Sequence, residues 1–225
     1  MSDTYNISVK FAADECRGTI TEKAATVMRM FGLTVDRLAE SRCKSGLRHN
    51  CKLQIDEGDI VYITGPSGSG KTVLMRELEK LIPASESVNL NQIELPKDKT
   101  LVDCIEDDSL IETLHKLNTA GLNDCFCILN QPCNLSEGQK YRFRLAMALD
   151  AGKKFVFADE FCSELDRIMA AVISYNLQKF AKRYKITFIL ASSHDDILRD
   201  LAPDVLIVRD FSSTADVIYK DSSRR

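Results

Sequence analysis

The sequence lacks the features that would tie this 225-residue chain to a membrane or draw it to a charged polymer. Its apolar stretches, such as 60–63 and 155–158, are far shorter than the roughly 20 residues that a membrane-spanning helix needs. The polar start Met1-Ser2-Asp3-Thr4 does not resemble a signal peptide, so we expect a cytoplasmic chain. Thirty basic and thirty-three acidic side chains leave a net charge of −3, which supplies no overall field to attract nucleic acid or anionic lipid.

Cysteine, by contrast, is plentiful, but the spacing of the eight cysteines favours neither a disulfide framework nor a metal site. The densest group is Cys125, Cys127 and Cys133. It lacks both the C-x-x-C spacing and the neighbouring histidine that are typical of structural zinc sites. We therefore favour thiols packed as small apolar side chains, with metal binding at this group as the open alternative.

Strand-like and helix-like segments alternate along the chain, which predicts an α/β domain with a mainly parallel sheet. The apolar run Ile60–Ile63 predicts a strand buried on both faces. Thr19-x-x-Glu22 resembles a capping box before an amphipathic helix that ends near Gly32. Further strands are expected at 5–11, 53–55, 88–90, 155–158, 186–191 and 205–208, and a helix at 74–82. The five prolines form no linker and the sequence has no internal repeat, so we expect a single domain.

A glycine-rich segment after residue 63 matches the phosphate-binding pattern G-x-x-x-x-G-K-[ST] in full, between a buried strand and a helix. Glycines allow backbone N–H groups to turn toward phosphates, and the helix N-terminus adds positive charge. We expect Lys71 to reach the β and γ phosphates of ATP and the Thr72 hydroxyl to bind Mg²⁺. The whole segment, a predicted nucleotide site, is Gly65-Pro66-Ser67-Gly68-Ser69-Gly70-Lys71-Thr72.

Two adjacent carboxylates follow the apolar run 155–158. The carboxyl ends of strands are where open α/β sheets bind ligands. Asp159 is expected to hold Mg²⁺, and Glu160 to polarise the attacking water. Alone, this pair would be weak evidence, because solvated strand ends often carry acids; the phosphate-binding loop makes it strong.

The segment Leu135-Ser136-Glu137-Gly138-Gln139 closely resembles the LSGGQ signature of ABC-type ATPases, with Glu137 in place of the first glycine. In that family the signature covers the γ-phosphate bound by the partner subunit, which assigns Ser136, Gly138 and Gln139 to the nucleotide. Ser136 is also a good N-cap for a helix that continues to residue 149, so a hydroxyl and a helix N-terminus face an anion together.

Three further landmarks of this family occur in the expected order. Gln92 resembles the Q-loop glutamine, which senses Mg²⁺ and the attacking water. Ser163-Glu164-Leu165-Asp166 resembles the D-loop that crosses to the other subunit, which places Asp166 at the nucleotide. His194, just after the strand expected at 186–191, resembles the switch histidine that bonds the γ-phosphate.

The resemblance covers roughly residues 50–210 and implies an ATP-hydrolysing homodimer, with two chains paired head to tail around two MgATP molecules. It implies a P-loop NTPase of ABC type, whose mainly parallel core sheet carries an antiparallel β part and a small helical subdomain. The expected division is an N-terminal strand and helix at 1–48, a core at 49–91 and 150–225, and the Q-loop, helical subdomain and signature at 92–149.

Two departures from the family pattern bear on the partner. Transporter subunits usually have Asp-Glu-Pro where this chain has Asp159-Glu160-Phe161, and an aromatic residue at a position that here reads Glu40-Ser41-Arg42. The first departure resembles soluble, acetyltransferase-associated ABC ATPases. We therefore expect an ATPase that drives an unidentified protein or macromolecule in solution. The alternative is the nucleotide-binding subunit of a membrane transporter, with membrane contact only through a separate permease.

Two other partner classes find less support in the sequence. Chromosome-maintenance ATPases insert a long coiled coil, but Gln92 and Leu135 are only 43 positions apart, which leaves too little room for one. Basic clusters at 140–144 and 179–185 could contact nucleic acid, but solvated helix faces explain them equally well.

Overall fold

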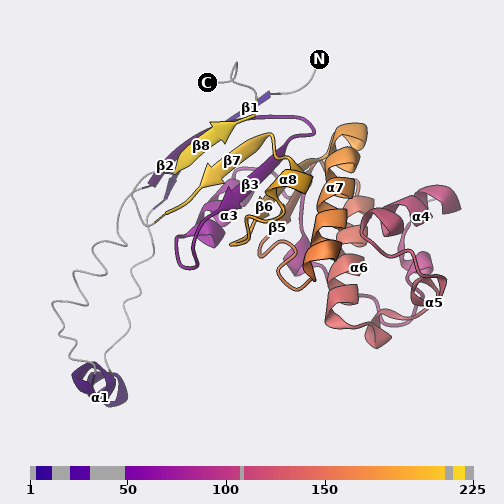
Figure 1. Ribbon diagram of the computed structural model, residues 1–225, viewed down its shortest axis with the longest axis horizontal. Coiled ribbons are helices and arrows are strands. Elements are labelled where there is room, and N and C mark those ends of the chain that lie inside the picture. Colours follow the sequence, from indigo (N-terminus) through magenta and orange to yellow (C-terminus); the bar gives the residue numbers. More distant parts are fainter. Residues whose placement is uncertain (1–3, 12–20, 31–48, 107–108, 211–214, 221–225) are drawn as a thin grey trace.

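The computed structural model describes residues 4–11, 21–30, 49–106, 109–210 and 215–220. Their strands form a two-stranded antiparallel sheet, β1-β2, and a six-stranded sheet in the order β4-β5-β6-β3-β7-β8 (Figure 1). The larger sheet is parallel except for β8, which pairs antiparallel with β7 at one edge. The strands are β1 (Thr4–Phe11), β2 (His49–Asp56), β3 (Ile60–Thr64), β4 (Ser87–Asn89), β5 (Phe155–Ala158), β6 (Thr187–Ala191), β7 (Val205–Val208) and β8 (Asp216–Tyr219).

Helices connect the parallel strands, and α4, α5 and α6 gather at one end of the molecule, away from the small sheet (Figure 1). None of the helices in the described ranges is both long and apolar enough to cross a bilayer. The α-helices are α1 (Glu22–Met30), α3 (Lys71–Lys80), α4 (Leu110–Thr119), α5 (Cys125–Ile128), α6 (Glu137–Asp150), α7 (Arg167–Tyr184) and α8 (Leu198–Leu201). Short 3₁₀ turns lie at η1 (Leu90–Gln92), η2 (Val102–Cys104) and η3 (Pro132–Asn134).

The central strands of the large sheet are buried on both faces, because apolar residues fill both sets of alternating positions. In β3, Ile60 and Tyr62 pack in the core that α6 and α7 complete. Val61 and Ile63 point to the opposite face and pack with α3 and β2. The sheet is therefore a rigid middle layer, and the loops at the carboxyl ends of its strands stand on a well-packed base.

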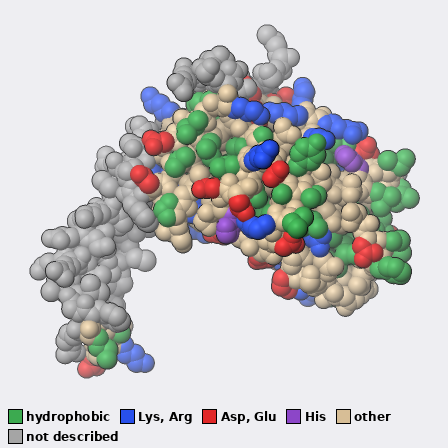
Figure 2. Space-filling view, viewed as in Figure 1, with side chains coloured by type: hydrophobic (Ala, Val, Ile, Leu, Met, Phe, Trp, Pro, Cys, Tyr) green, Lys and Arg blue, Asp and Glu red, His purple; other side chains and the backbone are tan. Residues whose placement is uncertain are grey.

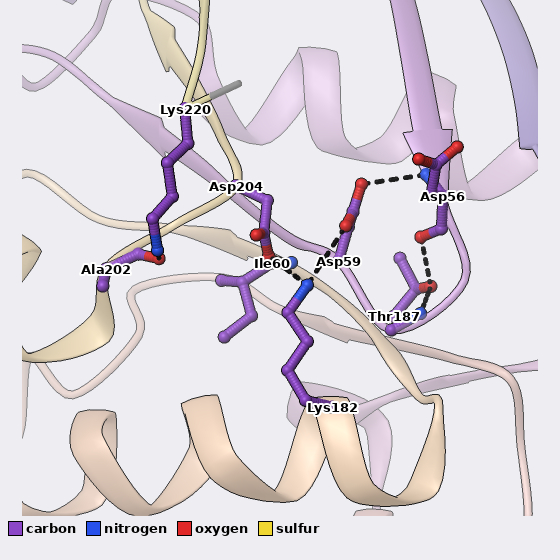
Figure 3. A network of polar contacts seen from close by, with 9 residues as sticks. Asp56, Asp59, Ile60, Lys182, Thr187, Ala202, Asp204 and Lys220 are labelled. Atoms are coloured by element: carbon purple, nitrogen blue, oxygen red, sulfur yellow. Dashed lines mark hydrogen bonds and ion pairs between the residues drawn. The ribbon is translucent and has the colours of Figure 1, made fainter. Parts of the chain in front are cut away.

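A network of polar contacts lies at the amino-terminal ends of the parallel strands, opposite the ends that carry the site loops (Figure 3). The Lys182 ammonium, from α7, bridges the carboxylates of Asp59 at 3.3 Å and Asp204 at 2.9 Å. Asp59 precedes β3 and Asp204 precedes β7, and Asp204 also accepts the Ile60 N–H at 3.0 Å. One lysine thus links the end of α7 to the start of two neighbouring strands.

The fold predicted from the sequence is confirmed: the sheet is mainly parallel, with an antiparallel part and a group of helices to one side. The predicted strands match the observed ones closely, but β8 is not predicted by the sequence analysis. The helix expected at 74–82 begins earlier, at Lys71, and ends at Lys80. Thr19, Gly32 and the stretch at 40–42 lie outside the described residues.

Candidate functional site

The glycine-rich loop after β3 leaves an open space at its centre. Gly68 has φ +81°, and a side chain carbon added there would meet no atom of the described chain within 4 Å. Gly70 caps α3 with φ +89° and provides no side chain to satisfy the first N–H groups of the helix. Ser69 Oγ is buried without a hydrogen-bond partner among the described residues. A loop with these open donors fits an anion such as a phosphate chain.

Lys71 begins α3, and its side chain folds back over this loop. Its ammonium group donates hydrogen bonds to the carbonyl oxygens of Gly65 at 2.8 Å and Pro66 at 3.0 Å. The residue is buried, so little water screens its charge. The structure thereby places the predicted phosphate-binding lysine at the loop, beside Thr72 on the same turn of helix.

A second cation, Arg209, lies beneath the loop and was not predicted from the sequence. Its guanidinium donates to the Ser69 carbonyl at 3.0 Å, and it is 1% exposed. Burial lowers the pKa of Arg209. The loop also packs tightly against the backbone of Arg209, because a side chain carbon added at Gly65 would lie 1.7 Å from the Arg209 carbonyl oxygen. An arginine directly after the apolar run of β7 is the sequence signal that could have revealed it.

The carboxylate pair follows β5, as predicted, and an asparagine holds its backbone. Asn91 Oδ1 accepts the Asp159 N–H at 2.8 Å, and Asn91 Nδ2 donates to the Asp159 carbonyl at 3.1 Å. Asp159 Oδ1 in turn accepts the Glu160 N–H at 3.0 Å. Glu160 has φ +50°, a left-handed conformation that turns the chain immediately after the strand. The sequence analysis missed Asn91, although it directly precedes Gln92.

A cavity of about 470 Å³ brings three of the predicted site residues together. Gln92, Asp159 and Glu160 line one side of it, and α3 forms the other with Met75, Arg76, Glu79 and Lys80. The carboxylates therefore face the helix that begins at Lys71. The phosphate-binding segment 65–72, the signature segment and His194 do not line this cavity.

His194 lies exposed in the loop after β6, and its backbone is anchored to the sheet. The buried Tyr62 hydroxyl donates to the His194 carbonyl, and burial raises the pKa of Tyr62. The Thr64 hydroxyl, at the end of β3, donates to the carboxylate of Asp195. Because Thr64 precedes Gly65, the histidine loop and the phosphate-binding loop meet at the carboxyl end of β3.

The signature segment forms the capped start of α6. Ser136 Oγ accepts the Gln139 N–H at 3.3 Å, and Gln139 Oε1 accepts the Ser136 N–H at 2.9 Å, which is a complete capping box. The predicted N-cap is confirmed. Glu137 is exposed and paired with Lys140 at 2.7 Å, and this hydrogen bond lowers the pKa of the Glu137 carboxyl.

The D-loop-like segment lies next to the signature in the same chain. A side chain carbon at Gly138 would be 3.4 Å from the Leu165 side chain. Asp166 caps α7 by accepting the Met169 N–H at 2.9 Å. Arg167 pairs with Asp196 at 2.9 Å, and its hydrogen bond lowers the pKa of the Asp196 carboxyl. Asp166 thus has a structural role in its own chain, which sequence reasoning did not predict.

The cysteine group does not assemble as a metal centre within the described residues. No three histidine, cysteine or acidic side chains cluster there in a way that could hold an ion. Cys125 and Cys133 are exposed, whereas Cys127 is buried and its thiol pKa is raised by burial.

Comparison with known proteins places these motifs in a family context. A family model described as ABC transporter matches residues 48–106. An aliphatic sulfonates import ATP-binding protein of Paracoccus denitrificans is 27% identical over 194 residues, which cover 79% of each chain. A methionine import ATP-binding protein of Vibrio vulnificus is 27% identical over 191 residues, 69% of this chain and 55% of that relative.

Solved structures resemble the fold at lower identity. A dimeric ATP-binding cassette in a post-hydrolysis state bound to ADP and Pi has a TM-score of 0.61 and 19% identity, over 77% of this chain and 90% of that one. A component of a Clostridium perfringens ABC transporter complex has a TM-score of 0.55 and 19% identity, over 74% of this chain and 78% of that one. The chain has the ABC-type P-loop NTPase fold, and its sequence is similar to ATP-binding proteins of ABC transporters.

Proposed function

We propose that the chain is the ATP-hydrolysing subunit of a membrane transporter and works as a head-to-tail dimer on two MgATP molecules. The observation that carries this proposal is the placement of the motifs. The phosphate-binding loop follows β3 and the carboxylate pair follows β5, at the same end of one sheet with β6 between these two strands. The signature instead starts α6 and does not line the cavity beside the carboxylates. A second copy would supply the missing signature.

The relatives favour a transporter over the partner in solution that the sequence analysis expected. Those described above are named import ATP-binding proteins, and none is described as an acetyltransferase-associated ATPase. The Asp159-Glu160-Phe161 variant therefore carries less weight than the sequence analysis gave it. Affinity purification from the native cell tests this point: recovery of a membrane permease supports transport, and recovery of partners without any permease contradicts it.

The residues at this site fit a nucleoside triphosphate. Lys71 would neutralise phosphate charge, and the open N–H groups of the loop would bind phosphate oxygens. Thr72 and Asp159, with Gln92 beside them, would hold Mg²⁺ together with the phosphates, and the bound ion would offset the negative charge of the γ-phosphate. Glu160 would accept a proton from the attacking water, and His194 would bond the γ-phosphate.

The partner subunit would complete the site with a capped helix start. Ser136, Gly138 and Gln139 would present a hydroxyl and backbone N–H groups to the γ-phosphate bound by the other chain. Asp166, in the segment beside Gly138, would cross toward the same interface. Phosphate oxygens would thus be held from two chains at once.

Glu160→Gln tests the assignment of the base. The variant keeps Lys71 and Thr72, so it should bind ATP but lose nearly all hydrolysis, and it should accumulate as a dimer in ATP. Light scattering after size-exclusion chromatography measures the dimer. Hydrolysis at the wild-type rate would remove Glu160 from this role.

Mixing two inactive variants tests the shared site. A Lys71→Ala chain keeps its signature and a Ser136→Arg chain keeps its phosphate-binding loop, so a mixed dimer contains one intact site. Partial activity is expected from the mixture. Heterodimers that form but stay inactive at every mixing ratio contradict the head-to-tail arrangement.

A further inference from the structure

A buried hydrogen bond joins the signature helix to the loop that carries Glu160. The Cys162 N–H donates to the Tyr141 hydroxyl oxygen at 2.9 Å. Tyr141 lies on α6, five positions after the capping Ser136, and Cys162 lies two positions after Glu160. Both residues are buried, at 4% and 1% exposed, so water cannot replace the bond if it is lost.

The loop needs support from outside because its backbone is unfavourable by itself. Glu160 and Cys162 have φ values of +50° and +57°, in the left-handed region that side chains other than glycine rarely adopt. Such residues persist where surrounding contacts hold them. The Phe161 N–H, between them, donates to the Ala191 carbonyl at 2.8 Å on β6. Tyr141 supplies the contact from α6.

This contact stays constant near neutral pH, because its donor is a backbone N–H and its acceptor does not ionise there. Burial raises the pKa of Tyr141 well above its usual value. Tyr141 therefore stays neutral, and its oxygen accepts the N–H throughout the working range. The helix between Ser136 and Tyr141 is regular, which places the two about 7–8 Å apart along its axis.

We propose that Tyr141 is a positioning residue, which acts from the signature helix to hold the Glu160 loop of its own chain in its catalytic conformation. The inference rests on the proposed function. In the dimer, α6 would then serve two sites: its first turn would face the nucleotide of the partner, and its second turn would fix the general base of its own site.

Tyr141→Phe removes the hydroxyl and preserves the ring. Its kcat for ATP hydrolysis is expected to fall about tenfold, with KM for ATP within about twofold of wild type, because the phosphate-binding loop is untouched. Tyr175→Phe is the matched control, since Tyr175 is exposed on α7 and its hydroxyl can be removed without touching the loop. An unchanged kcat in Tyr141→Phe overturns the proposal.

Mixed dimers show whether Tyr141 acts on its own chain. In the pair of Lys71→Ala and Ser136→Arg chains, the intact site uses Glu160 of the Ser136→Arg chain and the signature of the other. Tyr141→Phe should therefore lower activity about tenfold when added to the Ser136→Arg chain, and less than twofold when added to the Lys71→Ala chain.

The opposite pattern, or an equal loss from both placements, overturns the positioning role. Each mixture contains one chain with Tyr141→Phe. A general loss of stability would therefore lower the activity of both mixtures equally, and this result would count against the proposal. A parent mixture that is inactive instead refutes the head-to-tail dimer, and this inference falls with it.

Discussion

Replacing Asn91 with alanine removes the two hydrogen bonds that hold the backbone N–H and carbonyl of Asp159. The bonds measure 2.8 and 3.1 Å, and each contributes about 0.5–1.5 kcal/mol net in a folded protein. Together they supply about 1–3 kcal/mol to the position of the two carboxylates. If that free energy is lost from the transition state, kcat should fall by about 5- to 150-fold. Nucleotide affinity should change little, because Lys71 and its loop are bonded elsewhere.

Steady-state hydrolysis and calorimetric titration with ATP separate these effects. Asn91→Asp is the informative second variant: it keeps an acceptor for the Asp159 N–H, loses the donor, and adds negative charge beside two carboxylates. Asn118→Ala, exposed on α4, is the control for loss of a surface amide. A folded Asn91→Ala protein with kcat within twofold of wild type would refute the reasoning, as would a loss that appears in ATP affinity alone.

Two further predictions concern stability and nucleotide choice. Lys182→Met should lower the free energy of unfolding by about 1–2 kcal/mol, less than for a fully buried pair because the Lys182 side chain is 47% exposed. Urea denaturation measures this loss, and a change below about 0.3 kcal/mol would mean that the Asp59 and Asp204 carboxylates are stabilised without the lysine. ATP and GTP should be hydrolysed with less than about tenfold discrimination, since the proposed contacts go to phosphates and Mg²⁺; comparison of kcat/KM for the two nucleotides checks this, and a larger preference for ATP would indicate an adenine-specific contact.

The sequence predicts the fold well where local chemistry alone determines it. The runs at 60–63 and 155–158 are apolar at every position, which fits strands covered on both faces, and the structure buries them completely. β8 escapes prediction because its residues alternate between exposed and half-buried at the sheet edge. A four-residue edge strand with polar ends is difficult to distinguish from a loop by periodicity.

The site is predictable to the extent that its parts are contiguous. The segment 65–72 and the capping box from Ser136 to Gln139 are local patterns, and their geometry follows from a few neighbouring residues. The supporting residues are different. Asn91 lies 68 positions from Asp159, Tyr141 lies 21 from Cys162, and Arg209 lies 140 from Ser69. Only the fold brings these pairs together, so no motif of fixed spacing could reveal them.

The conformation of the carboxylate loop shows why such remote contacts matter for chemistry. A left-handed conformation costs a residue other than glycine roughly 1 kcal/mol or more, and the loop has two, at Glu160 and Cys162. Hydrogen bonds from Asn91, Tyr141 and the Ala191 carbonyl, each contributing about 0.5–1.5 kcal/mol, are sufficient to offset that cost. They come from three different elements: the turn after β4, the helix α6 and the strand β6. A displacement of any one of these elements would therefore change the position of Glu160, although none of the three contacts involves its carboxylate.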